Sequence, residues 1–167
     1  MFKKIILVLA LILPMSVFAQ KFGVVDIDAI MQAMPETAAA QEQLNEASKK
    51  YENEVQKLQE ELQKLYTDFQ AIQDDPNTPQ TIKERRMQEI QTRAANVDNF
   101  RNTASQDLQR QHEQLMAPIQ QKLLDAIKAV GQDGNFTFIM PNEGILLYTG
   151  SDVSNVTNEV KAKLGVK

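Results

Sequence analysis

The 167-residue chain contains no cysteine, no tryptophan and a single histidine, His112. Without cysteine there can be no disulfide framework, no thiolate metal site and no lipid attached through an N-terminal cysteine. His112 lies in a polar stretch with no serine or cysteine nucleophile at a recognisable spacing, so we interpret it as a solvated helix residue. The six glycines form no phosphate-binding loop. The sequence therefore predicts a protein that is not an enzyme and uses neither a cofactor nor a metal.

Positive charge followed by apolar residues marks the N-terminus. Lys3 and Lys4 precede a short apolar run over residues 5–13, and Val17-Phe18-Ala19 fits a signal peptidase site. We expect residues 1–19 to be a signal peptide cleaved after Ala19, which places the mature protein in the periplasm if the source is a bacterium. The alternative is an uncleaved N-terminal anchor, although the run is shorter than the roughly 20 apolar residues that span a bilayer.

The rest of the chain is acidic. Once Lys3 and Lys4 are set aside, 16 basic residues face 22 acidic ones. This balance disfavours a nucleic-acid partner, because binding to phosphates calls for a net basic surface. It also argues against a strong contact with an anionic membrane surface and leaves room only for a weak one.

A short polar segment, residues 74–79, separates two long runs that are almost free of glycine and proline. Prolines cannot continue a helix interior, and Asp, Asn and Thr favour turns and caps. We therefore interpret Asp74 and Asp75 as turn residues and not as a metal-binding or acid/base pair. Thr78 is the expected N-cap of the second helix, with Pro79 at its first position. Apolar residues on both sides repeat at alternating gaps of three and four, which predicts a heptad seam: Val55, Leu58, Leu62, Leu65, Phe69 and Ile72 before the segment, and Met87, Ile90, Ala94 and Val97 after it.

These features predict a mainly α protein with a small β body, an α+β fold. Residues 36–118 form an antiparallel helical hairpin, here called the arm, with its tip at 74–79. Residues 20–35 and 119–167 form the base, in which strands over 22–26, 136–140 and 145–149 share one sheet. So small a sheet is a weak independent core, so we expect the base to self-associate.

Three further features of the helices are expected. Asp28 would cap a short helix over residues 29–33. Pro118 would kink the second long helix and act as a hinge near the base of the arm. Val156, Val160 and Leu164 would form one face of a terminal helix that Gly165 ends.

Two groups of side chains on the arm are candidate contact residues. Four cations cluster close to the tip and suggest either contact with anionic lipid or lipopolysaccharide, or an ordinary solvated face with glutamates between them. Four apolar residues lie off or beside the seam and suggest either packing within an irregular hairpin or weak, adaptable contacts with a partner polypeptide. The cations are Lys83, Arg85, Arg86 and Arg93, and the apolar residues are Tyr66, Ile82, Phe100 and Met116.

Motifs in the base carry a family resemblance. The strand Phe22-Gly23-Val24-Val25-Asp26 is followed by Met34-Pro35-Glu36 and then by the long hairpin. Pro118-Ile119-x-x-Lys122 leads into Phe136-x-Phe138-Ile139, and Val156-Thr157-x-x-Val160 lies near the end. Over essentially the whole chain after the signal peptide, this arrangement resembles the Skp (OmpH-like) periplasmic chaperone family.

The resemblance implies a homotrimer in which the strands of three chains build a β body and three hairpins enclose a cavity. Unfolded outer-membrane proteins, the clients, would be held in that cavity without nucleotide, and the candidate apolar residues would contact them. Well-known members of the family are strongly basic, whereas this chain is acidic. Confinement and weak apolar contacts are therefore expected to contribute more here than long-range attraction. The alternative is a structural coiled-coil spacer or adaptor of the cell envelope.

Overall fold

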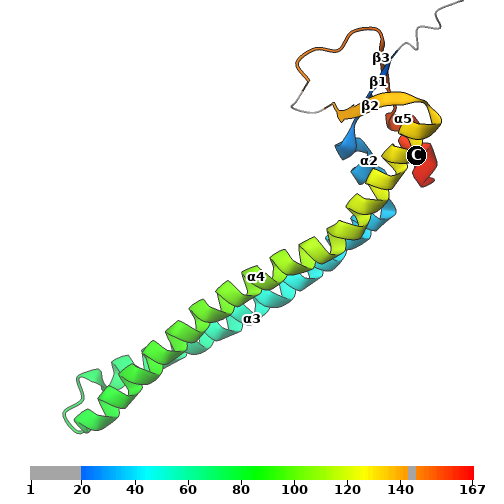
Figure 1. Ribbon diagram of the computed structural model, residues 1–167. Coiled ribbons are helices and arrows are strands. Elements are labelled where there is room, and N and C mark those ends of the chain that lie inside the picture. The colour runs from blue at the N-terminus through cyan, green and yellow to red at the C-terminus, as the bar shows by residue number, and fades with distance from the viewer. Residues whose placement is uncertain (1–19, 143–145) are drawn as a thin grey trace, which may run out of the picture.

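The computed structural model describes residues 20–142 and 146–167, so the expected signal peptide lies outside the described residues. A long two-helix arm projects from a small base that contains a sheet and two short helices (Figure 1). The elements in chain order are β1 (Lys21–Val25), α2 (Ile27–Ala33), α3 (Pro35–Gln73), α4 (Gln80–Asp133), β2 (Phe136–Pro141), β3 (Val153–Asn155) and α5 (Thr157–Leu164).

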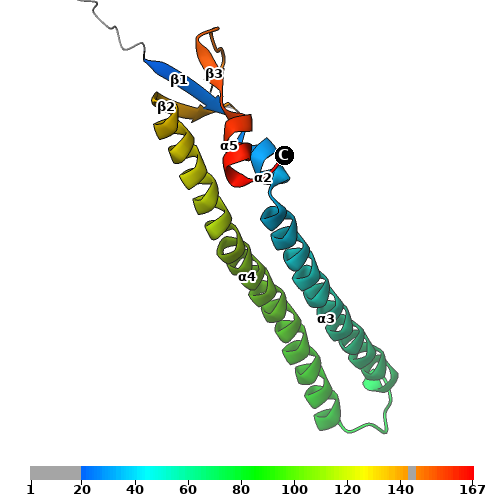
Figure 2. The same ribbon diagram turned by 90° about the vertical axis from the view of Figure 1, so that its right-hand side faces the viewer.

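The arm consists of α3 and the first two thirds of α4, which lie side by side in both views (Figures 1 and 2). α3 begins at Pro35 because the preceding Met34 is extended, with ψ 122°, as a residue before proline prefers. It ends at Gln73 and α4 begins at Gln80, so the predicted hairpin is confirmed, and residues 74–79 connect its two helices.

The cap expected at the start of α4 is wrong. Pro79 is the N-cap, without a side-chain hydrogen bond. Instead of capping the helix, the Thr78 hydroxyl donates a hydrogen bond of 2.7 Å to Asp75 Oδ2. Asp75 Oδ1 also accepts from the backbone N–H of Asn77 at 3.0 Å. The Asp75 carboxylate therefore accepts hydrogen bonds from within the turn, as in an Asx turn. It binds the Thr78 hydroxyl, which would otherwise be free to cap α4.

The sheet has the order β2-β1-β3, with both outer strands parallel to β1. The N-terminal strand is therefore central, and the two C-terminal strands flank it. Phe22 lies opposite Phe138 in β2 and opposite Val153 in β3. The predicted sharing of one sheet by the two ends of the chain is confirmed.

The strand expected over 145–149 is wrong. Ile145 lies outside the described residues, and residues 146–149 form no strand. The third strand is β3, which is only three residues long. It precedes Val156, whose N–H donates to the carbonyl oxygen of Val24 at 2.9 Å and whose side chain is 1% exposed. Burial of Val156 against the core therefore selects this segment over the more strand-like sequence before it.

The core of the base lies between the sheet, α2, α5 and the last turns of α4. Figure 2 shows α5 and α2 next to one another beside the sheet end of α4. Ile30 and Val160 are fully buried, and Met34 is 1% exposed. The remaining buried members of this cluster are Val25, Ala40, Ile119, Leu123, Ala126, Val130 and Val156. The terminal helix ends as predicted at Gly165, whose φ of 75° suits glycine.

The N-cap of α2 is Asp26, not Asp28, because Asp26 Oδ1 accepts from the backbone N–H of Ala29 at 2.7 Å. The backbone N–H of Asp26 donates to the Thr157 hydroxyl at 2.9 Å. That hydroxyl donates in turn to Asn155 Oδ1 at 2.6 Å, and Asn155 Oδ1 also accepts from the backbone N–H of Thr157. One buried threonine therefore joins the start of α2 to the start of α5.

Among the described residues, no helix is long and apolar enough to span a membrane.

Replacing Thr157 with Val should lower the free energy of unfolding by about 1–3 kcal/mol, because the N–H of Asp26 loses its acceptor inside the base. Urea unfolding at fixed protein concentration measures this as a lower midpoint with an unchanged slope. Thr137→Val, at an exposed position of β2, is the matched control and should change stability by less than about 0.5 kcal/mol. Equal midpoints for Thr157→Val and the unsubstituted protein would contradict the role given to this hydroxyl.

Candidate functional site

The arm exposes part of its own hydrophobic seam. Between Leu44 and Phe69, no residue of α3 is fully buried, and Leu58, Leu62 and Leu65 are half-buried. On α4, Ile90 and Val97 are buried at the same interface. A pair of helices covers only the facing side of each seam, so its flanks stay in contact with solvent.

The structure divides the four predicted apolar contact residues into two pairs. Tyr66 and Ile82 are 42% and 40% exposed, which fits an external contact. Phe100 instead packs within the arm, edge-on to the ring of Tyr51 at 6.0 Å between centroids. Met116 packs against the core of the base.

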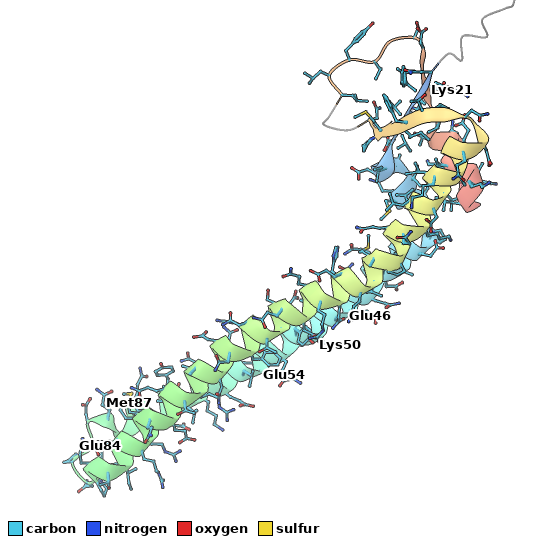
Figure 3. The ribbon with its side chains drawn as sticks, viewed as in Figure 1. Lys21, Glu46, Lys50, Glu54, Glu84 and Met87 are labelled. Carbon is cyan, nitrogen blue, oxygen red and sulfur yellow. The ribbon has the colours of Figure 1, made fainter. Side chains whose placement is uncertain are left out.

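Sequence reasoning missed Met87 as a surface residue, because it falls on the heptad seam. In the structure it is 38% exposed and lies near the tip, close to Glu84 (Figure 3). The signal available in the sequence was its position near the start of α4, where a two-helix seam is least covered. Tyr66, Ile82 and Met87 are from here on called the distal apolar residues.

Two of the four cations of the predicted basic patch have acidic partners. Arg86 contacts Glu89 at 2.7 Å, and Arg93 reaches across the arm to Glu61 at 3.5 Å. Lys83 donates to the carbonyl oxygen of Gln73 at 2.8 Å, which ties the start of α4 to the end of α3. These contacts favour a solvated face with internal pairing over a concentrated anion-binding surface.

Hydrogen bonds within the turn at the tip stabilise the charged form of the Asp75 carboxylate. The hydrogen bond from the Thr78 hydroxyl is the main cause that lowers the pKa of Asp75, and the N–H of Asn77 adds to it. The carboxylate is therefore held in its charged form as a hydrogen-bond acceptor of the turn. These hydrogen bonds support the interpretation of Asp75 as a structural residue of the turn.

The arm meets the base where two of the motifs behind the family resemblance come together. Glu36 at the start of α3 forms an ion pair with Lys122 of α4, 86 residues away in sequence. Beside the ion pair lies a shallow, mostly apolar groove of about 350 Å³, lined among others by Ala39, Ala40, Leu115 and Ile119. Ala40 is buried at this level and belongs to the core cluster of the base.

Pro118 lies inside α4, and the helix continues through it to Asp133. The expected boundary between arm and base at 118–119 is therefore crossed by a single helix. Because Pro118 has no N–H, α4 lacks one backbone hydrogen bond at this level. The hinge at Pro118 stays a prediction.

The sheet presents a second apolar surface on the side away from the helical core. A small cavity of about 170 Å³ lies there, lined by Phe22, Val24, Phe138, Met140 and neighbours from the loop before β3. Phe138 is 48% exposed, and Leu147 and Tyr148 in that loop are 102% and 85% exposed. These residues are called the open sheet face. Sequence reasoning assigned the loop to a strand and so did not recognise it as an exposed apolar segment.

His112 is exposed on α4. Within residues 20–142 and 146–167, no group of three or more His, Cys, Asp or Glu side chains is arranged to hold a metal ion. What the described residues offer is contact surface: the half-covered seam, the distal apolar residues and the open sheet face.

Fold and surface together define a class of protein in which a two-helix arm projects from a small base built on a parallel sheet. The family described as Outer membrane protein (OmpH-like) matches residues 21–164, and the chain belongs to this family. The fold is similar to that of a candidate outer membrane chaperone (OmpH-like) from Caulobacter crescentus CB15. The TM-score is 0.72 at 14% sequence identity, over 87% of this chain and 83% of that one. Comparison with curated proteins finds no match.

The ion pair at the base of the arm predicts a dependence of stability on pH. The hydrogen bond from Lys122 is the main cause that lowers the pKa of Glu36 below its ordinary value of 4.5. A carboxylate with a lowered pKa contributes stability above its unfolded-state pKa, and this contribution disappears as the pH falls through the folded-state value.

Lys122→Gln should therefore reduce the loss of stability on acidification between about pH 5 and pH 3. Urea midpoints measured across this range test it. Lys64→Gln removes an exposed lysine of α3 that takes part in none of the ion pairs between the described residues, and it should leave the acid dependence as in the unsubstituted protein. Parallel acid profiles for the unsubstituted protein and Lys122→Gln would show that the ion pair does not act in solution.

Proposed function

We propose that this protein is an ATP-independent periplasmic holdase that binds unfolded outer-membrane proteins between helical arms and prevents their aggregation. The observation that carries the proposal is the half-covered seam of the arm, where Leu58, Leu62 and Leu65 stay partly exposed. An unfolded client exposes apolar side chains along its length, and many shallow contacts of this kind can hold it without a fixed geometry. Membership of the OmpH-like family and the fold shared with a candidate chaperone support the same function.

The charges of the chain shape how such a holdase would work. Without Lys3 and Lys4, 16 basic residues face 22 acidic ones, and a net negative charge opposes the long-range attraction of acidic clients. Three of the four cations near the tip have internal partners: Arg86 pairs with Glu89, Arg93 pairs with Glu61, and Lys83 donates to a backbone carbonyl. Retention would therefore depend on confinement and apolar contact, and added salt should weaken client binding little.

The open sheet face supports assembly of the base into an oligomer, for which we propose a homotrimer. Leu147 and Tyr148 are almost fully exposed beside an apolar cavity of about 170 Å³ on the same chain. A surface that carries both exposed apolar side chains and an apolar hollow can be complementary to a second copy of itself. Three copies joined in this way would place three arms around one cavity.

A spacer or adaptor of the cell envelope is the second candidate. The observation that favours it is the continuity of α4, which runs without a break from Gln80 to Asp133 through Pro118. Such a helix could hold two partners at a fixed separation. The two functions differ in their partners, because a spacer requires a folded partner and a holdase an unfolded one.

The holdase function predicts that the mature protein suppresses aggregation of a porin diluted from urea, at near-stoichiometric trimer and equally well with ATP or EDTA. Light scattering of the diluted porin measures this. The absence of protection at several-fold trimer excess would overturn the holdase and leave the spacer as the better candidate.

Replacing all three distal apolar residues, Tyr66, Ile82 and Met87, with Ser should weaken protection several-fold, because shallow apolar contact is removed from the free end of the arm. The matched control replaces three exposed glutamines of the same helices, Gln63, Gln88 and Gln91, with Ser, and should protect as well as the unsubstituted protein. Equal loss in both triple variants would assign the effect to helix stability instead of client contact.

The trimer is tested separately by sedimentation of the mature protein at a fixed micromolar concentration. The double variant Leu147→Ser, Tyr148→Ser should lower the association constant at least about tenfold, because each buried apolar side chain contributes roughly 1.5–3 kcal/mol. Leu124→Ser, at a 49% exposed leucine of α4, is the control and should leave assembly unchanged. A monomeric unsubstituted protein would exclude the trimer, and an unaffected double variant would exclude the open sheet face as its interface.

A further inference from the structure

A cluster of polar side chains lies inside the arm, at a level where the two helices would otherwise meet through apolar residues. Tyr51 of α3 donates its hydroxyl to Asp107 Oδ2 of α4 at 2.5 Å. Gln111 donates to the same oxygen at 2.5 Å, and Arg110 contacts Asp107 Oδ1. Tyr51, Asp107 and Gln111 are called the polar clamp.

Among the described residues, the clamp is the best-shielded contact between polar side chains of α3 and α4. The Asp107 side chain is only 16% exposed, and Tyr51 and Gln111 are half-buried. The two ion pairs between α3 and α4 are open to solvent. Glu36 and Lys122 are 42% and 50% exposed, and Glu61 and Arg93 are 57% and 41% exposed. Exposed pairs contribute little, whereas a shielded carboxylate that loses a donor is costly.

The apolar seam by itself discriminates poorly between alignments of the two helices. Between the clamp and the tip, several seam positions are small or only half covered, such as Leu58, Leu62 and Ala94. A slip of one helical turn would replace these side chains with others of similar type. The same slip would remove Tyr51 from Asp107 and leave a shielded carboxylate with one donor fewer. A polar group at a seam position is the best-attested device for setting the register of paired helices.

We propose that the polar clamp sets the register of α3 against α4, so that the arm can bend but its helices cannot slide past one another. The ring of Tyr51 adds to this by packing edge-on against Phe100, at an interplanar angle of 62°. The aromatic contact and the hydrogen bond fall on the same side chain, so a single residue joins α3 to two turns of α4. This inference does not depend on the proposed function, because it concerns the alignment of two helices in one chain.

The absence of cysteine makes the register directly measurable, because every thiol in a variant is an introduced one. Glu61→Cys combined with Arg93→Cys reports the register seen here, since these side chains meet across the arm. Glu61→Cys combined with Glu89→Cys, or with Asn96→Cys, reports a slip of about one turn in either direction. A short, rigid bismaleimide then gives a cross-linking rate for each pair.

In the otherwise unsubstituted chain, the 61–93 pair should react much faster than either slipped pair. Tyr51→Phe should raise the rate of a slipped pair relative to the 61–93 pair by about tenfold, because one hydrogen bond to a charged group is lost. Tyr66→Phe removes the hydroxyl of an exposed tyrosine on the same helix and should leave the ratios unchanged. Unchanged ratios in Tyr51→Phe would overturn the proposal.

Far-UV circular dichroism establishes whether the Tyr51→Phe arm folds. If it does not, Asp107→Asn decides the question. A neutral acceptor binds the tyrosine about half as strongly, so the slipped pairs should gain roughly threefold. If Asp107→Asn gives the same ratios of cross-linking rates as the unsubstituted chain, the proposal is overturned.

Discussion

A hairpin of two helices has only one internal interface, and most properties of this protein depend on that constraint. A heptad seam needs at least one facing helix, but its flanks are covered only when further helices are present. In the arm, α3 therefore keeps its leucines half-buried from Leu58 to Leu65, while α4 buries Ile90 and Val97 in the same interface. The incomplete cover makes the arm weakly stabilised and at the same time provides an extended apolar surface.

The base compensates for this by tying the two ends of the chain together. β1 pairs with strands that lie more than one hundred residues later, and Thr157 joins the N-cap of α2 to the start of α5. Glu36 and Lys122 add a contact at the point where the arm leaves the base. These interactions hold the roots of both helices at a fixed separation, so the arm needs only moderate cohesion of its own.

Much of this architecture could be predicted from the sequence, because strong local signals agree with the fold. Pro35, the polar segment at 74–79 and Gly165 each end or begin a helix as their backbone preferences require. The predictions were wrong where tertiary contacts, and not local sequence preferences, determine the structure. Residues 145–149 have strand propensity, yet Val156 draws the neighbouring segment into the sheet. Asp26 displaced Asp28 as a cap, and Asp75 took Thr78 away from α4. Met87 and the polar clamp depend on which side of a seam faces the partner helix, and heptad spacing does not specify this.

The central position of β1 has a consequence for how the chain reaches its fold. The first strand is made first but has no neighbour until β2 and β3, at residues 136–141 and 153–155, are available. The hairpin between them consists of contacts that are local at the tip, so it can close early, and its closure brings the distant strands together. When α3 and α4 pair from the tip toward the base, they bring the remote strands together in small steps. This avoids most of the entropic cost of closing one large loop. In a chain that emerges N-terminus first, the arm would thus act as the template on which the base is completed last.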